Sequence, residues 1–294
     1  MSRHRSCLAC PGSSEQMLGK LQGLPADEVV VDLEDAVAAG AKDEARKLVA
    51  EWLASADLGD RYLSVRVNAV GTPWFQRDVL ALAELERRPD SIVVPKVEGP
   101  GDLASVEHLL AEAEAEAGVG DRSPLGIQAL VETAAGLARV GEIAAAGGRL
   151  EALVIGYADL AASLGRAPDA DPAIWDAARD SVLVAARANG LRAIDGPHLA
   201  IEAGEGLLAS ARRAEAAGFE GKWAIHPSQL ETLNEVFTPP AAELEWARRV
   251  IAALDEAEAG GAGAVELDGQ MLDEALRASA LRVLSRAPGD GGEA

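Results

Sequence analysis

The feature that most constrains the fold is an alternation of eight short apolar runs with longer amphipathic segments. The runs have the length and β-branched character of buried strands, and the segments between them have helical spacing. Eight strand–helix units in succession predict an α/β fold, the (β/α)₈ or TIM barrel. The eight runs are Ser6–Cys10, Glu28–Leu33, Tyr62–Val67, Ser91–Pro95, Leu125–Glu132, Leu153–Leu160, Leu191–Asp195 and Lys222–His226.

A doubly wound open sheet is the alternative architecture for such a chain. That fold usually has fewer strands and a glycine-rich phosphate-binding turn after the first one. Pro11-Gly12-Ser13 is not a turn of that kind, and the glycines of Gly260–Gly263 lie between two expected helices. The sequence therefore favours the closed barrel.

The 294-residue chain divides into three expected parts. Residues 1–238 are the barrel, 239–287 a C-terminal helical extension, and 288–294 a disordered tail rich in Gly, Asp and Glu. One helix is expected from Ala241 to about Ala259 and another up to about Leu284. The extension is interpreted either as an arm that packs on the barrel wall or a neighbouring subunit, or as a lid over the active site.

Composition excludes some functions and leaves others open. The net charge of -21 argues against nucleic acid as the main partner, although a local basic cluster could still bind a phosphorylated ligand. No apolar run approaches the roughly 20 residues of a membrane helix, and Pro11-Gly12 interrupts the early run, so a cytoplasmic protein is expected. Cys7 and Cys10 are interpreted as small apolar residues, with a redox pair as the alternative.

Polar residues stand at the ends of seven of the eight runs. Parallel barrels build their active sites at the carboxyl ends of several strands at once, so these residues predict a functional ring at the barrel mouth. The ring comprises Asp32, Glu34, Asp35, Arg66, Asn68, Lys96, Glu132, Asp159, Asp195 and His226.

Glu132 and Asp159 are the central pair of this hypothesis. They follow the fifth and sixth runs, and two carboxylates from nearby strands suit one Mg²⁺ ion whose remaining ligands are water and substrate. The alternative is that each acid caps the helix that follows it.

Three further side chains admit two interpretations each. Arg66 could bind a substrate carboxylate with its forked donors, or form an ion pair with Glu34, Asp35 or Glu132. Lys96 could meet a phosphate or the acidic ring, or form a salt bridge with Glu98 or another neighbour. His226 could be a base or a ligand-facing donor, or a satisfied imidazole at a strand end. The four histidines do not form a cluster of zinc ligands.

Motifs along nearly the whole chain resemble the citrate lyase β-subunit-like acyl-CoA lyases, within the class II aldolase/citrate lyase superfamily. They occur in the family's order and include Arg5-Ser6 with Pro11-Gly12, Asp32–Val37, Lys42 with Ala45-Arg46, Val65–Asn68, Pro95–Glu98, Val131–Ala134, Gly156 with Asp159-Leu160, Ala193–Asp195, Gly218–Lys222, Ile225–Gln229, and Gly263-Ala-Val with Asp268–Asp273.

The resemblance implies a metal site and a way to hold a carboxylate. Glu132 and Asp159 would bind Mg²⁺, for which Mn²⁺ can substitute, and the metal would chelate a 2-oxoacid or 2-hydroxyacid. Arg66 would bind substrate oxygens, and the backbone amides around Ala158 and Asp159 would hold the carboxylate. The supporting residues in this assignment are Asp32, Glu34, Asp35, Asn68 and Lys96.

The resemblance also implies a CoA thioester substrate and an oligomer. Lys20, Ile225 and His226 would bind CoA, and Asp273 would be the acid/base, contributed by the lid of a neighbouring subunit. That arrangement implies a homo-oligomer, a trimer or a hexamer. The chain departs from the family pattern at Ala9, where a larger residue is common, and at Gln16, where some members have a CoA-contacting lysine.

The expected activity is Mg²⁺-dependent cleavage or formation of a carbon–carbon bond in a 3-hydroxyacyl-CoA such as malyl-, citramalyl- or citryl-CoA. The products of cleavage are an acyl-CoA and a 2-oxoacid. Within this resemblance three alternatives remain: a CoA thioester hydrolase, an aldolase of the same fold that acts on free acids, and a non-catalytic lyase subunit.

Overall fold

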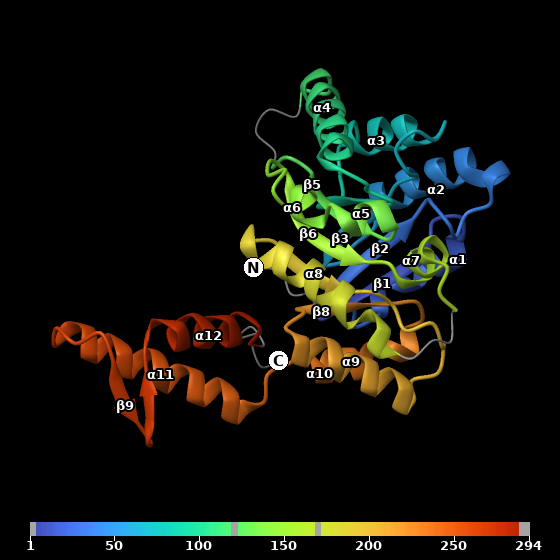
Figure 1. Ribbon diagram of the computed structural model, residues 1–294. Helices are drawn as coiled ribbons and strands as arrows, with labels where there is room; N and C mark the ends of the chain where they lie inside the picture. Colours follow the sequence, from blue (N-terminus) through green and yellow to red (C-terminus); the bar gives the residue numbers. More distant parts are fainter. Residues whose placement is uncertain (1–3, 119–122, 168–171, 288–294) are drawn as a thin grey trace. The chain divides into compact units, whose positions relative to one another are not determined.

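The computed structural model describes residues 4–118, 123–167 and 172–287 (Figure 1). Eight parallel strands form a closed barrel in sequence order, and β1 pairs with both β2 and β8. The predicted (β/α)₈ architecture is therefore confirmed. The strands are β1 Ser6–Pro11, β2 Glu28–Asp32, β3 Tyr62–Arg66, β4 Ser91–Val94, β5 Gly126–Val131, β6 Leu150–Ile155, β7 Arg192–Asp195 and β8 Gly221–Ala224.

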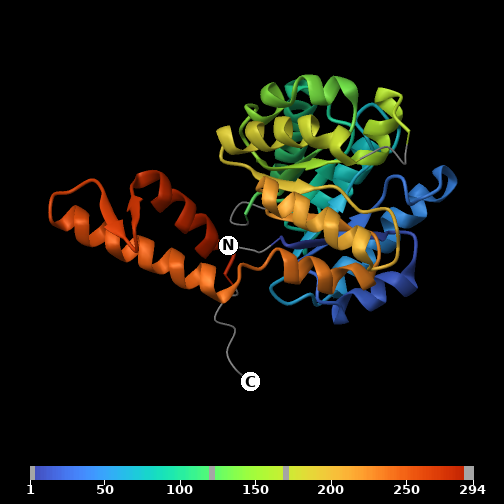
Figure 2. The same cartoon turned by 60° about the horizontal axis from the view of Figure 1, so that its bottom comes forward.

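Helices surround the barrel and return the chain from the end of each strand to the start of the next (Figures 1 and 2). Their inward faces carry the apolar residues predicted from the helical spacing, for example Ala45, Val49 and Leu53 of α2. These helices are α1 Glu15–Lys20, α2 Lys42–Ser55, α3 Phe75–Ala83, α4 Pro100–Glu116, α5 Ala134–Ala138, α6 Val140–Ala144, α7 Tyr157–Leu164, α8 Asp176–Ala188, α9 Glu205–Ala217 and α10 Leu230–Val236.

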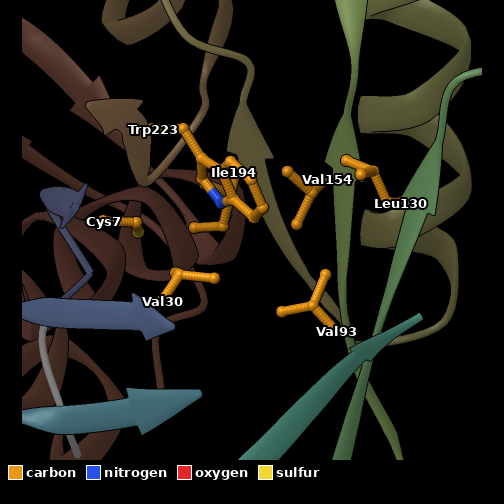
Figure 3. Close-up of a cluster of buried hydrophobic side chains, with 7 residues drawn as sticks. All are labelled: Cys7, Val30, Val93, Leu130, Val154, Ile194 and Trp223. Carbon is orange, nitrogen blue, oxygen red and sulfur yellow. The ribbon is translucent and has the colours of Figure 1, made fainter. Parts of the chain in front are cut away.

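The inside of the barrel contains an apolar layer built from alternate residues of the strands (Figure 3). It is a packed core that separates polar residues at the two ends of the barrel. Cys7 belongs to this layer, whereas Cys10 lies on the opposite face of β1, because side chains alternate along a strand. The redox-pair interpretation is therefore wrong, and both thiols are free and buried. The layer consists of Cys7, Val30, Val93, Leu130, Val154, Ile194 and Trp223.

A buried hydrogen-bond network fills the amino end of the barrel. Glu28, which begins β2, accepts bonds from Gln128 Nε2 at 2.7 Å and from the Ser64 hydroxyl. Its other oxygen lies 2.7 Å from His4 Nδ1. His4, Cys7 and Glu28 are close enough to hold a metal ion, but Nδ1 of His4 and both Glu28 oxygens already bond within the network. We interpret this network as structural.

The chain divides into two compact units, Ser2–Asn234 and a smaller one that starts at Glu235. The smaller unit contains α11 Ala241–Ala259, α12 Glu274–Ser285 and a two-stranded antiparallel hairpin, β9 Val265–Leu267 with β10 Gln270–Leu272. The two helices lie side by side (Figures 1 and 2). Leu272 and Ala280 pack with Ala247, Val250 and Leu254 of α11 in a core of its own.

The helices α11 and α12 were expected from the sequence, whereas the β9–β10 hairpin was not. The boundary predicted after residue 238 stays a prediction, as does the disordered tail 288–294, which lies outside the described residues. Within the residues that the structure describes, no helix is both long enough and apolar enough to cross a bilayer.

Candidate functional site

The carboxyl ends of β2 to β6 bring seven of the predicted residues together by direct contacts or by charge interactions. They are Asp32, Glu34, Asp35, Arg66, Lys96, Glu132 and Asp159. The order of strands in the barrel explains this gathering, because each strand is hydrogen-bonded to the next one in sequence.

Arg66 is held in one orientation by Asp32. Its Nε and Nη2 donate to the two carboxylate oxygens of Asp32 at 2.8 and 2.6 Å, and Nη1 lies 3.2 Å from Glu34. The ring of Trp223 lies 5.7 Å from the guanidinium carbon. Burial alone would lower the pKa of Arg66, but Asp32 and Glu34 raise it above its ordinary value. The ion pair with Glu34 was foreseen as an alternative, whereas the forked pair with Asp32 was not.

Asp32 also shapes the loop that carries Glu34. It is 2% exposed, and its oxygens accept the backbone N–H groups of Glu34 at 2.7 Å and Ala36 at 3.0 Å. Lys42, also buried, donates from Nζ to the carbonyls of Leu33 and Glu34 at 3.0 and 2.7 Å. The loop after β2 is thus fixed from both sides. Lys42 was noted only as part of a motif, and its role in this loop was missed.

Lys96 follows β4 in a left-handed conformation with φ of 53°. This region is uncommon for residues other than glycine, and such backbone strain gathers at functional sites. Its backbone N–H donates to Glu132 Oε1 at 3.0 Å. Its ammonium contacts Glu34 and lies 3.6 Å from Asp35 and 3.9 Å from Asp159. Of the alternatives considered for Lys96, the contact with the acids at the barrel mouth is the one observed, and within the described residues no salt bridge with Glu98 is formed.

Glu132 is a buried carboxylate, 2% exposed, at the end of β5. In the described part of the chain no cationic side chain lies within 4.0 Å of it. Burial raises the pKa of Glu132 to about 8, and the nearby charges of Asp159 and Glu34 act in the same direction. Gly156 makes room for this side chain, because a Cβ there would lie 2.5 Å from Glu132 Oε2.

Asp159 lies in the first turn of α7, with its side chain 39% exposed. Among the described residues it accepts no hydrogen bond from the helix amides, and Gly156 is the N-cap of α7. Thr133 caps α5 by accepting the Gly136 N–H at 3.0 Å. Neither Glu132 nor Asp159 therefore makes a capping hydrogen bond within the described residues, although Asp159 occupies a first-turn position that favours an acid.

This donor set fits a hard divalent cation. A buried carboxylate without a cationic partner, a second carboxylate that is partly exposed, and further acids close by are the chemistry that Mg²⁺ and Mn²⁺ accept. The exposed side of Asp159 leaves access for water and for a substrate.

Other predicted residues lie elsewhere or make different contacts. Asn68 donates from Nδ2 to the Leu33 carbonyl at 3.0 Å and to Asp78 at 2.6 Å, so it fixes loops beneath the site. Asp195 is fully buried and bonds to Lys222 and Tyr157. Neither side chain joins the ring at the mouth.

The residues predicted to bind CoA follow two adjacent strands. Lys20 is exposed at the end of α1, after β1, and Ile225 and His226 are exposed after β8. Since β1 pairs with β8, these residues follow neighbouring strands. His226 Nδ1 accepts the Ser228 N–H at 3.2 Å and caps the short 3₁₀ helix Pro227–Gln229.

Asp273 stands in the C-terminal unit, at the N-cap of α12. Its Oδ1 accepts the backbone N–H groups of Ala275 at 3.1 Å and Leu276 at 3.2 Å. The residue is exposed, so its second oxygen is open to other partners.

Comparisons with known proteins show which family the chain resembles. Residues 5–227 match the family model described as HpcH/HpaI aldolase/citrate lyase. A relative from Cereibacter sphaeroides named (3S)-malyl-CoA thioesterase is 41% identical over 283 residues, covering 96% of this chain and 94% of that protein. L-malyl-CoA/beta-methylmalyl-CoA lyase from Rhodobacter capsulatus is 38% identical over 290 residues, covering 92% and 90%.

Among solved structures, protein CitE from Mycobacterium tuberculosis superposes with a TM-score of 0.75 at 33% identity, over 96% of this chain and 97% of that one. That structure is a complex with magnesium, acetoacetate and coenzyme A. The match to the family model over most of the barrel, together with relatives that cover nearly the full length, shows that the chain belongs to the HpcH/HpaI aldolase/citrate lyase family.

Proposed function

We propose that this protein is a Mg²⁺-dependent carbon–carbon lyase that cleaves, or forms, a 3-hydroxyacyl-CoA of the malyl-CoA type. The observation that carries the proposal is Glu132, a buried carboxylate without a cationic partner in the described chain, next to Asp159 at the same barrel mouth. The malyl-CoA chemistry in the names of two full-length relatives supports the choice of substrate class.

Glu132 and Asp159 would hold the metal, with Mn²⁺ as an acceptable substitute. When bound, Mg²⁺ supplies a Lewis acid that orients the substrate's carboxylate and neighbouring oxygen and stabilises negative charge there. The amides of Ala158 and Asp159, at the start of α7, are the groups we assign to the substrate carboxylate.

Arg66 would stabilise the oxygen on which charge develops. In cleavage the hydroxyl proton passes to a base, the bond to the α-carbon of the thioester breaks, and its electron pair becomes the CoA enolate while the hydroxyl carbon becomes the carbonyl of the 2-oxoacid. A guanidinium has five N–H donors, so the contacts with Asp32 and Glu34 leave others for substrate. Because Asp32 fixes its orientation, Arg66 would need little reorganisation.

Asp273 would return a proton to the enolate carbon in cleavage, or remove it in condensation. We assign this residue to the lid of a neighbouring subunit, and therefore propose a homo-oligomer, a trimer or a hexamer. Lys20, Ile225 and His226 would bind the CoA moiety after the adjacent strands β1 and β8. The supporting residues are those that fix Arg66 and the loops, namely Asp32, Glu34, Asp35, Asn68 and Lys96. The free thiols of Cys7 and Cys10 suit a cytoplasmic location.

A thioester hydrolase of the malyl-CoA type is the second candidate. It is favoured by the 41% identical relative, whose name is (3S)-malyl-CoA thioesterase. Hydrolysis would release free CoA and malate, whereas lyase cleavage would release acetyl-CoA and glyoxylate.

The test is to incubate the purified protein with malyl-CoA and Mg²⁺ and to follow free thiol and glyoxylate separately. We expect glyoxylate to form with acetyl-CoA, and we expect turnover to stop with EDTA and to return with Mg²⁺ or Mn²⁺. Free thiol formed without glyoxylate would favour the hydrolase. Turnover that survives EDTA, or that survives the double substitution Glu132→Ala and Asp159→Ala, would refute the metal mechanism.

A further inference from the structure

A second buried charged cluster lies beside the proposed metal site and has no part in the mechanism above. It contains Asp195 at the end of β7, Lys222 in β8, Tyr157 at the start of α7 and Arg179 in α8. Asp195 is 0% exposed, Lys222 1% and Arg179 5%. Burying polar and charged groups costs free energy unless each is hydrogen-bonded.

Each member of the cluster bonds to another. The Tyr157 hydroxyl donates to Asp195 Oδ1 and accepts from Arg179 Nε at 2.8 Å. Lys222 Nζ donates to Asp195 Oδ2 and to the Gly196 carbonyl at 2.6 Å. Arg179 Nη1 also lies 2.7 Å from Asp176. The cluster thus joins the end of β7 and the first half of β8 to the beginning of α7 and to α8.

Tyr157 is the member that connects this cluster to the site. It is the first residue of α7, directly before Ala158 and two residues before Asp159. Its ring packs against Gly196, where an added Cβ would lie 2.8 Å from Tyr157 Cδ2. The ring of Trp175 lies 5.3 Å from it between centroids. The side chain of Tyr157 is thus fixed by its hydroxyl and by its ring.

We propose that Tyr157 and Asp195 are positioning residues that hold the first turn of α7, so that Asp159 and the amides of Ala158 and Asp159 face the metal and the substrate carboxylate. The inference rests on the function proposed above. Lys222 and Arg179 neutralise and orient Asp195 and Tyr157. None of the four touches substrate or metal, and they act through the placement of α7.

A tyrosine hydroxyl that only stabilised the fold would not affect metal binding. Another tyrosine in the chain provides a matched control for Tyr157. Tyr62, at the start of β3, is also a largely buried tyrosine whose hydroxyl donates to a carboxylate, that of Glu151. Glu151 belongs to the early part of β6, so this pair lies toward the amino end of the barrel, away from Asp159. Tyr62→Phe therefore removes a comparable hydroxyl without touching α7.

The experiment compares Mn²⁺ binding to wild type, Tyr157→Phe and Tyr62→Phe by electron paramagnetic resonance titration, first with Mn²⁺ alone and then with glyoxylate. We expect Tyr157→Phe to weaken Mn²⁺ binding about tenfold, the lower end of the effect typical of residues that orient metal ligands. Tyr62→Phe should bind Mn²⁺ like wild type, although both variants lower the thermal midpoint. In turnover assays Tyr157→Phe should raise KM for malyl-CoA more than it lowers kcat.

Equal Mn²⁺ affinity in Tyr157→Phe and Tyr62→Phe would overturn this inference while leaving the metal site intact. A wild-type protein that binds no Mn²⁺ would overturn the metal site and this inference with it. Asp195→Asn is the second variant, in case loss of the tyrosine hydroxyl prevents folding. It should also weaken Mn²⁺ binding, and faster amide exchange in residues 157–161 should accompany the loss. Unchanged Mn²⁺ affinity in folded Asp195→Asn would contradict the role of the cluster.

Discussion

At the scale of single residues, the cationic side chains of the site, Arg66 and Lys96, form ion pairs with acids other than Glu132. Arg66 is bound to Asp32, and the Lys96 ammonium is shared among Glu34, Asp35 and Asp159, so Glu132 is left without an ionic partner in the described structure. Glu132 and Asp159 could be singled out from their places after apolar strands. The forked Asp32–Arg66 pair was not foreseen, because the expected strand order placed three acids, Asp32, Glu34 and Asp35, at the end of the strand before Arg66 and did not distinguish among them.

The cluster around Asp195 could have been found from one anomaly. Lys222 stands within an apolar strand, and a buried ammonium needs a counter-ion. Asp195, at the end of the preceding strand, was the nearest acid in the expected topology. Tyr157 had no comparable pattern, because a tyrosine at a strand–helix junction is equally suited to ordinary packing.

The first prediction concerns Gly156. Gly156→Ala should displace the Glu132 side chain, because the added methyl would lie 2.5 Å from Oε2. We expect Mn²⁺ affinity to fall at least about tenfold, measured by paramagnetic resonance. The matched control is Gly141→Ala in α6, where an added Cβ meets no atom within 4 Å. That variant should bind Mn²⁺ normally, and normal binding by Gly156→Ala would show that the glycine does not shape the site.

The second prediction concerns Glu28 and pH. Burial alone would raise its pKa, but hydrogen bonds from His4, Ser64 and Gln128 lower the pKa below the ordinary value of 4.5. A lowered carboxyl pKa gives stability that is present above the unfolded pKa and is lost as pH falls through the folded one. Glu28→Gln should therefore cost about 2–3 kcal/mol near neutral pH.

That difference should shrink when urea unfolding, followed by circular dichroism, is repeated at successively lower pH below 4.5. Gly23→Ala, where an added Cβ meets nothing within 4 Å, serves as the control whose effect should not vary with pH. A pH-independent cost for Glu28→Gln would mean that the pKa of Glu28 is the same in the folded and unfolded chains, and a cost that grows at lower pH would mean that its folded pKa is raised.

At the scale of elements, the strands were more predictable than their surroundings. All eight barrel strands lie where the apolar runs indicated, mostly with shifts of one to three residues at the ends. The largest difference is the end of β6, which stops at Ile155, whereas the expected run continued to Leu160; Asp159 therefore lies in α7, Tyr157–Leu164. The β9–β10 hairpin was missed because its strands are only three residues each, too short for a period of two to be distinguished from chance. Its Asp268-Gly269 turn was the available indication, since this dipeptide favours a tight hairpin turn.

The third prediction tests that turn. Gly269 has φ of +83°, a left-handed conformation that alanine adopts at a cost of about 1–2 kcal/mol. Gly269→Ala should therefore speed amide exchange in β9 and β10 while leaving the barrel amides unchanged. Gly263→Ala, which has open space around its Cβ and no positive φ, is the control. Equal exchange in the two variants would argue that the turn does not depend on glycine.

At the scale of the whole molecule, the chain consists of a large barrel unit and a small helical unit with its own core. The proposed metal ligands belong to the first and Asp273 to the second. The sequence indicated both units from the extra helices after the eighth strand. It could not indicate the contacts of the proposed oligomer, because helix spacing alone does not specify which surfaces meet.

The fourth prediction tests whether Asp273 acts between chains. Asp273→Ala alone and the double variant Glu132→Ala with Asp159→Ala should each be inactive on malyl-CoA. Mixed oligomers of the two, formed by co-expression, should regain part of the activity if one chain's Asp273 serves another chain's metal site. Acetyl-CoA formation by mixed and separate preparations is the measurement. Mixed oligomers that stay inactive would place Asp273 at the site of its own chain or outside the reaction.

The apolar layer inside the barrel separates the polar groups at its two ends (Figure 3). It consists of Cys7, Val30, Val93, Leu130, Val154, Ile194 and Trp223. Its buried hydrophobic side chains lie between the carboxylates at the mouth and the Glu28 network at the opposite end. Substitutions at the barrel mouth can therefore change substrate preference without disturbing the Glu28 hydrogen-bond network at the amino end. Substitutions at the amino end that stabilise the barrel should likewise leave the activity at the barrel mouth unchanged.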